Sequence, residues 1–81
     1  MEKTKPMLPL NLVSPGKKVV LKAIVGGRKI RSRMIDMGLS KGMEFRVIQN
    51  FRPGPCIIGI GNSKLALGRG ISEKIIVEEK E

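Results

Sequence analysis

The sequence predicts a mainly β protein: a small antiparallel β-barrel of five or six short strands with one short helical insertion. Three observations support this fold class. Turn signals rich in glycine and proline recur about every 8–12 residues, and the segments between them are short and rich in β-branched residues. Only one segment carries apolar residues at helical spacing. A chain of 81 residues buries one compact core, so we expect a single domain.

The first long strand is predicted directly after a turn. Ser14-Pro15-Gly16-Lys17 has proline at the first central position and glycine at the second, which is the arrangement of a type II turn. Residues 18–25 (KVVLKAIV) are rich in apolar and β-branched residues and therefore favour a strand. Gly26-Gly27 interrupts this pattern, so we expect the strand to end there.

A helix is predicted over residues 28–37 (RKIRSRMIDM). Apolar side chains recur there at positions i, i+4 and i+7, which places them on one stripe: Ile30, Met34 and Met37. Gly38 is expected to end the helix, because glycine adopts the left-handed conformation without a Cβ penalty. Leu39 is then expected to close over Met34, which is the apolar contact of a Schellman cap.

A half-buried strand is predicted next, over residues 43–51 (MEFRVIQNF). Its residues alternate in polarity, and one face carries Met43, Phe45 and Val47. Residues 52–55 (RPGP) cannot continue a strand and predict a tight loop.

A hairpin is predicted from residues 56–60 and 64–67, which flank Gly61-Asn62-Ser63. Gly59 lies inside the first of these strands and indicates a bulge or a sharp bend, as small barrels need.

The last elements set the predicted domain boundaries. Residues 70–74 predict one helical turn, and Ile75-Ile76-Val77 predicts the closing strand. We expect residues 1–7 to form a flexible N-terminal tail, residues 8–78 to form the barrel, and residues 79–81 to form a charged tail.

The composition excludes several kinds of chemistry. The chain has no histidine, which excludes Ser-His-Asp and Cys-His catalysis and every histidine-ligated metal site. The single cysteine, Cys56, can form neither an internal disulfide nor a CxxC metal site, and we interpret it as a small residue of the core or its rim. We therefore expect no enzyme activity, no cofactor and no metal site. A lone free cysteine fits a cytoplasmic location.

The net charge of +9 and the pI near 10.3 favour acidic partners: nucleic acid, anionic lipid or an acidic protein surface. The chain has no tryptophan, no tyrosine and two phenylalanines, so the aromatic platforms that hold single-stranded nucleic acid are nearly missing. No apolar run approaches the roughly 18 residues of a membrane span, so we do not expect the chain to cross a bilayer.

The densest positive charge falls on the predicted helix, where four of six consecutive residues are basic: Arg28, Lys29, Arg31 and Arg33. This cluster is either a solvated helix face or a docking surface for an acidic partner. Arginine and methionine are enriched at protein interfaces, and Met37-Gly38-Leu39 adds an apolar corner beside the cluster. The candidate partner-binding residues are Arg28, Arg31, Arg33, Met37, Gly38 and Leu39.

Several segments together resemble the FeoA family of small accessory proteins of bacterial ferrous iron uptake. The most specific is the segment 31–42 (RSRMIDMGLSKG), which is similar to the family's central "RxRLxDMGLxxG" pattern, with Met34 where the family usually has leucine. The resemblance also runs through residues 12–16 (LVSPG), 24–27 (IVGG), 54–55 (GP), 58–67 and 75–77, and covers roughly residues 10–78.

This resemblance implies an SH3-like barrel that docks on the cytosolic domain of a FeoB-type GTPase transporter and modulates it. It also implies a possible transition-metal ligand, Fe²⁺, because the same barrel is the C-terminal domain of metal-dependent repressors. A small basic nucleic-acid-binding barrel and a transition-metal-binding domain stay as alternatives, although no nucleic acid is expected. We expect a monomer or a weak oligomer.

Overall fold

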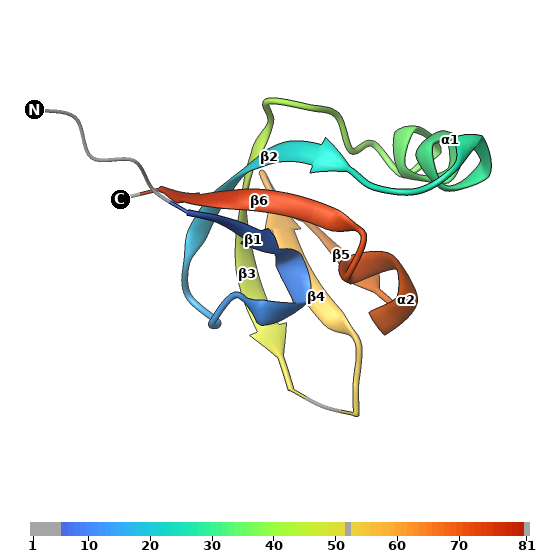
Figure 1. The fold of residues 1–81 in the computed structure, drawn as a ribbon. Helices are drawn as coiled ribbons and strands as arrows, with labels where there is room; N and C mark the ends of the chain where they lie inside the picture. Colours follow the sequence, from blue (N-terminus) through green and yellow to red (C-terminus); the bar gives the residue numbers. More distant parts are fainter. Residues whose placement is uncertain (1–5, 52, 81) are drawn as a thin grey trace, which may run out of the picture.

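The computed structural model describes residues 6–51 and 53–80 and is built mainly from one antiparallel β-sheet (Figure 1). Two helices and one 3₁₀ turn interrupt the strands. In chain order the elements are β1 (Met7–Pro9), η1 (Leu10–Leu12), β2 (Lys18–Ile24), α1 (Arg28–Asp36), β3 (Glu44–Asn50), β4 (Cys56–Ile60), β5 (Ser63–Leu67), α2 (Arg69–Ser72) and β6 (Ile75–Lys80).

The sheet has the strand order β1-β6-β2-β3-β4-β5, and every neighbouring pair is antiparallel. The strands bend around a common interior, and α1 projects from one end of β2 (Figure 1). The mainly β class with one short helical insertion is therefore confirmed. After α1 the chain returns to β2, where the amide of Gly42 donates a hydrogen bond to the carbonyl of Leu21 at 2.8 Å.

The core lies on the inner face of the sheet, where alternate side chains of each strand point. On β3, Phe45 and Val47 are buried while Glu44 and Arg46 are exposed, as the alternating pattern predicts. The helix adds one buried residue to this interior, Met34. The buried apolar set is Leu10, Val13, Val19, Leu21, Met34, Leu39, Phe45, Val47, Cys56, Ile58, Leu67, Ile75 and Val77.

The end of α1 is the predicted Schellman cap. Gly38 has φ +91°, its amide donates to the carbonyl of Ile35 at 2.9 Å, and the amide of Leu39 donates to the carbonyl of Met34 at 2.9 Å. Both hydrogen bonds satisfy carbonyls that the helix would otherwise leave free. The cap turns the chain back toward the barrel, and Leu39 enters the core beside Met34.

The barrel strands extend beyond the predicted boundaries at both ends. Met7, which we assigned to the N-terminal tail, lies in β1 opposite Glu78 of β6. Glu79 and Lys80, which we assigned to the C-terminal tail, belong to β6 and lie opposite Val19 and Lys18. Pairing with β2 extends this strand past its apolar part. Of the two predicted tails, residues 1–5 and 81 lie outside the described residues.

The bulge that Gly59 indicated lies on the opposite strand. The register of β3 against β4 shifts between Val47 and Gln49, so Ile48 is the extra residue. Gly59 leaves room for it, because a Cβ atom at Gly59 would lie 2.9 Å from Cδ1 of Ile48. Gly59 therefore marks the place where the bulged side chain of Ile48 packs against β4.

A polar cluster joins the parts of the chain that β-pairing leaves apart. The side-chain amide of Asn50, at the end of β3, donates to the carbonyls of Asn11 at 3.0 Å and Val13 at 2.7 Å. Its carbonyl oxygen accepts a hydrogen bond from Nη1 of Arg69 at 2.6 Å. Nε of Arg69 also donates to the carbonyl of Gly54 at 2.9 Å. One asparagine thereby ties η1, β3 and α2 together.

Replacing Asn50 should therefore be costly. Asn50→Ala removes three hydrogen bonds and leaves backbone carbonyls and a guanidinium without their partner, so we expect a loss of about 2–4 kcal/mol in the free energy of unfolding. Urea unfolding followed by circular dichroism measures it. Gln49→Ala, at the exposed neighbouring position, is the control and should change stability by about 0.5 kcal/mol or less. Equal effects of the two substitutions would contradict the role of the cluster.

Candidate functional site

The structure separates the predicted partner-binding residues into two groups. Arg28, Arg31 and Arg33 are exposed on α1, as a docking surface requires. Leu39 does not form the exposed apolar corner that we expected, because its side chain is 1% exposed and packs in the core. Met37 is half-buried against that core, and Gly38 is exposed but has no side chain. The helix cap therefore directs Leu39 into the core, so this side chain is not available as an exposed apolar contact.

A groove lies where α1 meets the end of β2, with a cavity volume of about 300 Å³. We call it the α1 groove. Arg31 and Ile35 lie one helical turn apart on the same side of α1 and form one wall. Leu39 and Lys41 come from the segment that follows the helix. The full lining is Ala23, Ile24, Arg31, Ile35, Leu39, Ser40 and Lys41.

Five residues of the α1 groove were missed by the sequence reasoning: Ala23, Ile24, Ile35, Ser40 and Lys41. Ile35 is an apolar residue that does not belong to the buried stripe of the helix, and its side chain is 66% exposed. That departure from the stripe was the only local signal for Ile35, and single exposed apolar residues are common on protein surfaces. Lys41 carried no such signal, because Ser40-Lys41-Gly42 is typical of a turn between a helix and a strand.

The charges at the start of α1 oppose the helix dipole. The first turn contains Arg28, Lys29 and Arg31 and no acidic residue, and the N-cap residue Gly27 has no side chain that could accept a hydrogen bond. The N-terminus of a helix favours negative charge, so each of these cations is unfavourably placed by a few tenths of a kcal/mol. An acidic group from another molecule would relieve this cost.

The described residues offer little for metal chemistry. Residues 6–51 and 53–80 contain no group of three or more histidine, cysteine, aspartate or glutamate side chains that could hold a metal ion. Cys56 is free and buried on β4. Burial raises the pKa of its thiol, and the positive charge of Arg69 partly opposes this shift. The thiol is thus held in its neutral, unreactive form.

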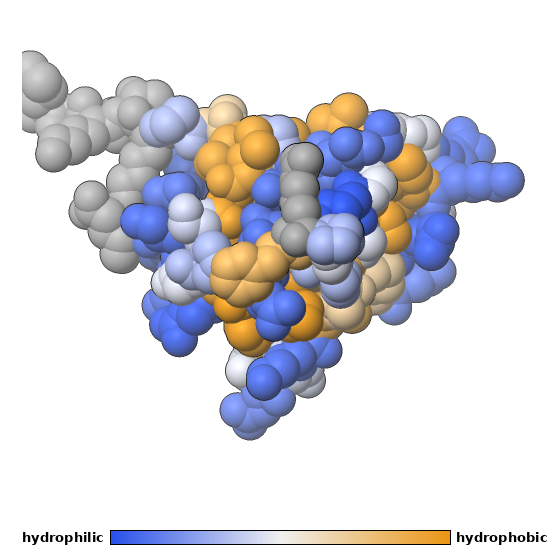
Figure 2. All heavy atoms as spheres, turned by 90° about the horizontal axis from the view of Figure 1, so that it is seen from below, coloured by the Kyte–Doolittle hydropathy of each residue, from blue (hydrophilic) through white to orange (hydrophobic). Residues whose placement is uncertain are grey.

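The surface is mixed in polarity. Seen from below, hydrophobic side chains form separate patches between hydrophilic ones (Figure 2). Within the described residues, no helix is both long enough and apolar enough to cross a membrane.

A family model described as the FeoA domain matches residues 8–79. The chain belongs to the FeoA family. The recognition made from the central segment of the sequence is thereby confirmed. The chain is also 39% identical over 75 residues to a protein of Methanocaldococcus jannaschii described as a candidate Fe(2+) transport protein A, covering 93% of this chain and 90% of the relative. FeoA membership associates the chain with ferrous iron transport.

Solved FeoA structures have the same fold. The crystal structure of an iron uptake regulatory protein (FeoA) matches with a TM-score of 0.86 at 31% identity, over 93% of this chain and all of that chain. The FeoA-like protein of Clostridium acetobutylicum matches with a TM-score of 0.81 at 28% identity, over 98% and 92% of the two chains. The SH3-like barrel is confirmed by these matches.

The same fold occurs within a larger protein. A manganese-dependent transcriptional repressor matches with a TM-score of 0.85 at 19% identity, over 96% of this chain and 44% of the repressor. At that identity the match shows the fold alone.

Truncation of Leu39 should destabilise the protein far more than truncation of Ile35. Leu39→Ala opens a cavity in the core and is expected to lower the free energy of unfolding by about 2–4 kcal/mol. Ile35→Ala removes an exposed side chain and should change it by about 0.5 kcal/mol or less. Chemical denaturation of both variants tests this. A stable Leu39→Ala variant would mean that the helix cap does not anchor α1.

Cys56 should react slowly in the native protein. A raised pKa leaves less thiolate at any given pH, and burial also blocks access of the reagent. We expect a thiol reagent such as iodoacetamide to modify the native protein at pH 8 at least about tenfold more slowly than the urea-unfolded chain. Mass spectrometry of timed samples measures both rates, and equal rates would contradict the burial of this thiol.

Proposed function

We propose that this chain is a cytoplasmic accessory protein of ferrous iron uptake that docks on the cytosolic part of a FeoB-type GTPase transporter and modulates it. Its membership of the FeoA family supports the transport role. The observation that carries the docking proposal is the α1 groove, in which apolar side chains lie between the cations Arg31 and Lys41.

The composition of the α1 groove suits a protein interface. Interfaces combine an apolar centre with a polar rim, and arginine is enriched among the residues that contribute most to binding. Ile35 supplies exposed apolar area that the fold itself does not use, and Arg31 stands one turn before it. A partner segment with an aliphatic side chain between carboxylates would fill the groove and balance both cations.

Electrostatics favour the same kind of partner. The chain carries a net charge of +9, and a field of this sign raises the encounter rate with an acidic surface while salt reduces it. A nearby carboxylate would stabilise the first turn of α1, because this turn has no side-chain cap and its cations oppose the helix dipole. Docking at the α1 groove would therefore relieve charges that cost stability in the free protein.

Docking can be tested by co-purification of a tagged transporter with variants of this chain. Arg31→Glu reverses a charge of the groove, and Ile35→Asp removes its exposed apolar wall, so each should lower the recovered amount at least about tenfold. Neither side chain is buried, so both variants should fold, which circular dichroism verifies.

A charge-matched control comes from the other end of β2. Lys17 is exposed and precedes β2, whereas α1 follows that strand, which is roughly 23 Å long at about 3.3 Å per residue. Lys17→Glu should bind within about twofold of the unchanged protein. Full retention of the Arg31→Glu and Ile35→Asp variants would exclude the groove. An unchanged rate of GTP hydrolysis and of iron uptake when the protein is bound would exclude modulation.

A further inference from the structure

A row of cations crosses the outer face of the sheet on the side away from the core. Residues that lie directly opposite each other on paired strands share one face. Lys18 of β2 lies opposite Lys80 of β6 and opposite Arg46 of β3. Arg46 lies opposite Gly59 of β4, and Gly59 lies opposite Lys64 of β5. One line across five strands thus carries four cations and a glycine.

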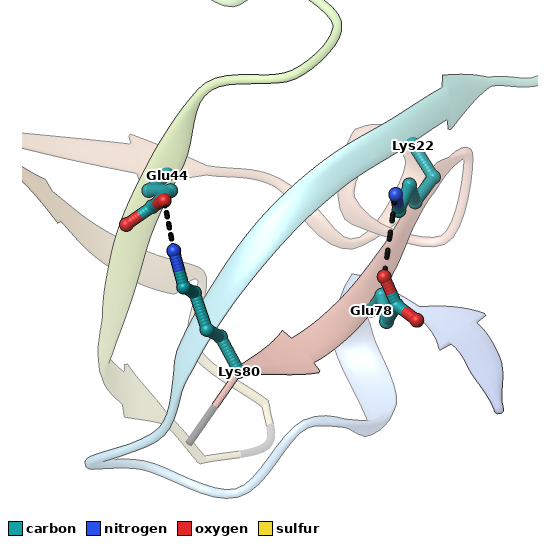
Figure 3. Close-up of polar contacts among 4 residues, drawn as sticks. All are labelled: Lys22, Glu44, Glu78 and Lys80. Carbon is teal, nitrogen blue, oxygen red and sulfur yellow. Dashed lines mark hydrogen bonds and ion pairs between the residues drawn. The ribbon is translucent and has the colours of Figure 1, made fainter. Parts of the chain in front are cut away.

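Such a row is unfavourable in the free protein, because like charges directly opposite each other on neighbouring strands destabilise a sheet. The carboxylates on this face are already occupied (Figure 3). Glu78 pairs with Lys22 at 3.2 Å, and Glu44 pairs with Lys80, which reaches across β2. Among the described residues, Lys18, Arg46 and Lys64 form no ion pair with a carboxylate.

Two cations of the row act on the carboxyl group of Glu44. The hydrogen bond from Lys80 and its positive charge hold the pKa of the Glu44 carboxyl below its usual value, and Lys18 adds to the shift. Since Glu44 already accepts a hydrogen bond from Lys80, it offsets one charge of the row. Lys18, Arg46 and Lys64 leave an excess.

The row is hollowed at its centre. A cavity of about 420 Å³ lies over this part of the sheet. Gly59 contributes no side chain to it, and Ile48, the bulged residue of β3, stands at its side. The lining is Lys18, Glu44, Phe45, Arg46, Ile48, Gly59 and Gly61. The glycine gap between Arg46 and Lys64 thus provides space for a ligand beside the unbalanced charges.

We propose that this hollow binds a free polyphosphate group, either inorganic or the tail of a nucleotide, and we call it the polyphosphate site. Its cations are Lys18 and Arg46 on the cavity wall and Lys64 beyond Gly59. The site shares no lining residue with the α1 groove, so it stands whether or not docking occurs there.

The chemistry of the site favours a compact ligand of several negative charges. One carboxylate would balance one of three cations, whereas a di- or triphosphate balances all of them. The planar guanidinium of Arg46 can donate two parallel hydrogen bonds to one phosphate group. A single nucleic acid strand is less suitable, because such strands need exposed aromatic rings for stacking, and Phe45 in the lining is only 3% exposed.

Calorimetric titration of the full chain with inorganic tripolyphosphate tests the proposal. We expect saturable binding of one ligand per chain that weakens as salt is raised. Arg46→Gln and Lys18→Gln should each weaken binding at least about fivefold, and the double variant should abolish it. Lys29→Gln loses the same charge on α1 and is the matched control, which should bind within about twofold.

Thermal unfolding gives a second, independent readout. Because Arg46→Gln removes a like-charge contact, the ligand-free variant should unfold at the same temperature as the unchanged protein or higher. The stabilisation by tripolyphosphate, present in the unchanged protein, should be lost in this variant. A variant that is destabilised without ligand would instead indicate a structural role for Arg46 and would overturn the proposal.

The remaining arms identify the ligand. A nucleoside triphosphate should bind about as well as tripolyphosphate, and the corresponding nucleoside should not bind. No saturable binding of tripolyphosphate, or an equal loss in the Lys29→Gln control, would overturn the proposal. Tighter binding of a short DNA duplex or of anionic lipid vesicles through Arg46 would also overturn it, because the surface would then recognise a phosphodiester backbone or a membrane.

Discussion

The closure of the barrel depends on the side chain of Asn50. The sheet begins at β1 and ends at β5, and these two edge strands are not paired with each other in the part of the chain that the structure describes. The gap is bridged by η1 and α2, and Asn50 is hydrogen-bonded to both, through the backbone of η1 and through Arg69 of α2. A small core cannot close such a gap by apolar contact alone, because unpaired backbone carbonyls would remain buried beside it. The hydrogen bonds of one amide satisfy these carbonyls and fix the ends of the sheet at the same time.

The position of α1 follows from a second constraint, which is independent of the first. The helix is inserted between β2 and β3, and only Met34 on the helix and Leu39 after its cap reach the core fully. These two side chains hold the helix against the end of the barrel, so most of its surface takes no part in folding. The fold therefore permits a basic first turn and an exposed Ile35 that a more deeply buried helix could not carry.

Much of this arrangement could be predicted from the sequence because the signals were local. The alternation of β3, the stripe on α1 and the cap at Gly38 each depend on residues that are close together in the chain, and the structure confirms them. The edge pairing of β1 with β6 could not be predicted, because no local pattern around Met7 indicates a strand. Met7 belongs to a strand only through its pairing with Glu78, which is far away in the sequence. The bulge was assigned to Gly59 rather than Ile48 for the same reason, since a register shift belongs to two strands. The cation row on the sheet also escaped prediction, because Lys18, Arg46 and Lys64 are far apart in sequence and are brought together only by the register of the strands.

Several cations of this chain lie where they lower the stability of the fold instead of raising it. A net charge of +9 on 81 residues opposes the compact state through self-repulsion. Dispersed cations would keep that cost low, yet here several are concentrated where a local rule disfavours them: at the positive end of a helix dipole and opposite one another on paired strands. Carboxylates from the chain itself reach Lys22 and Lys80, which shows that the sheet can neutralise a lysine where two strands bring an acid close. Among the described residues, Lys18 on β2 and Arg46 on β3 form no ion pair with a carboxylate. Stability of the free protein does not account for this arrangement, whereas a negatively charged ligand at each surface would.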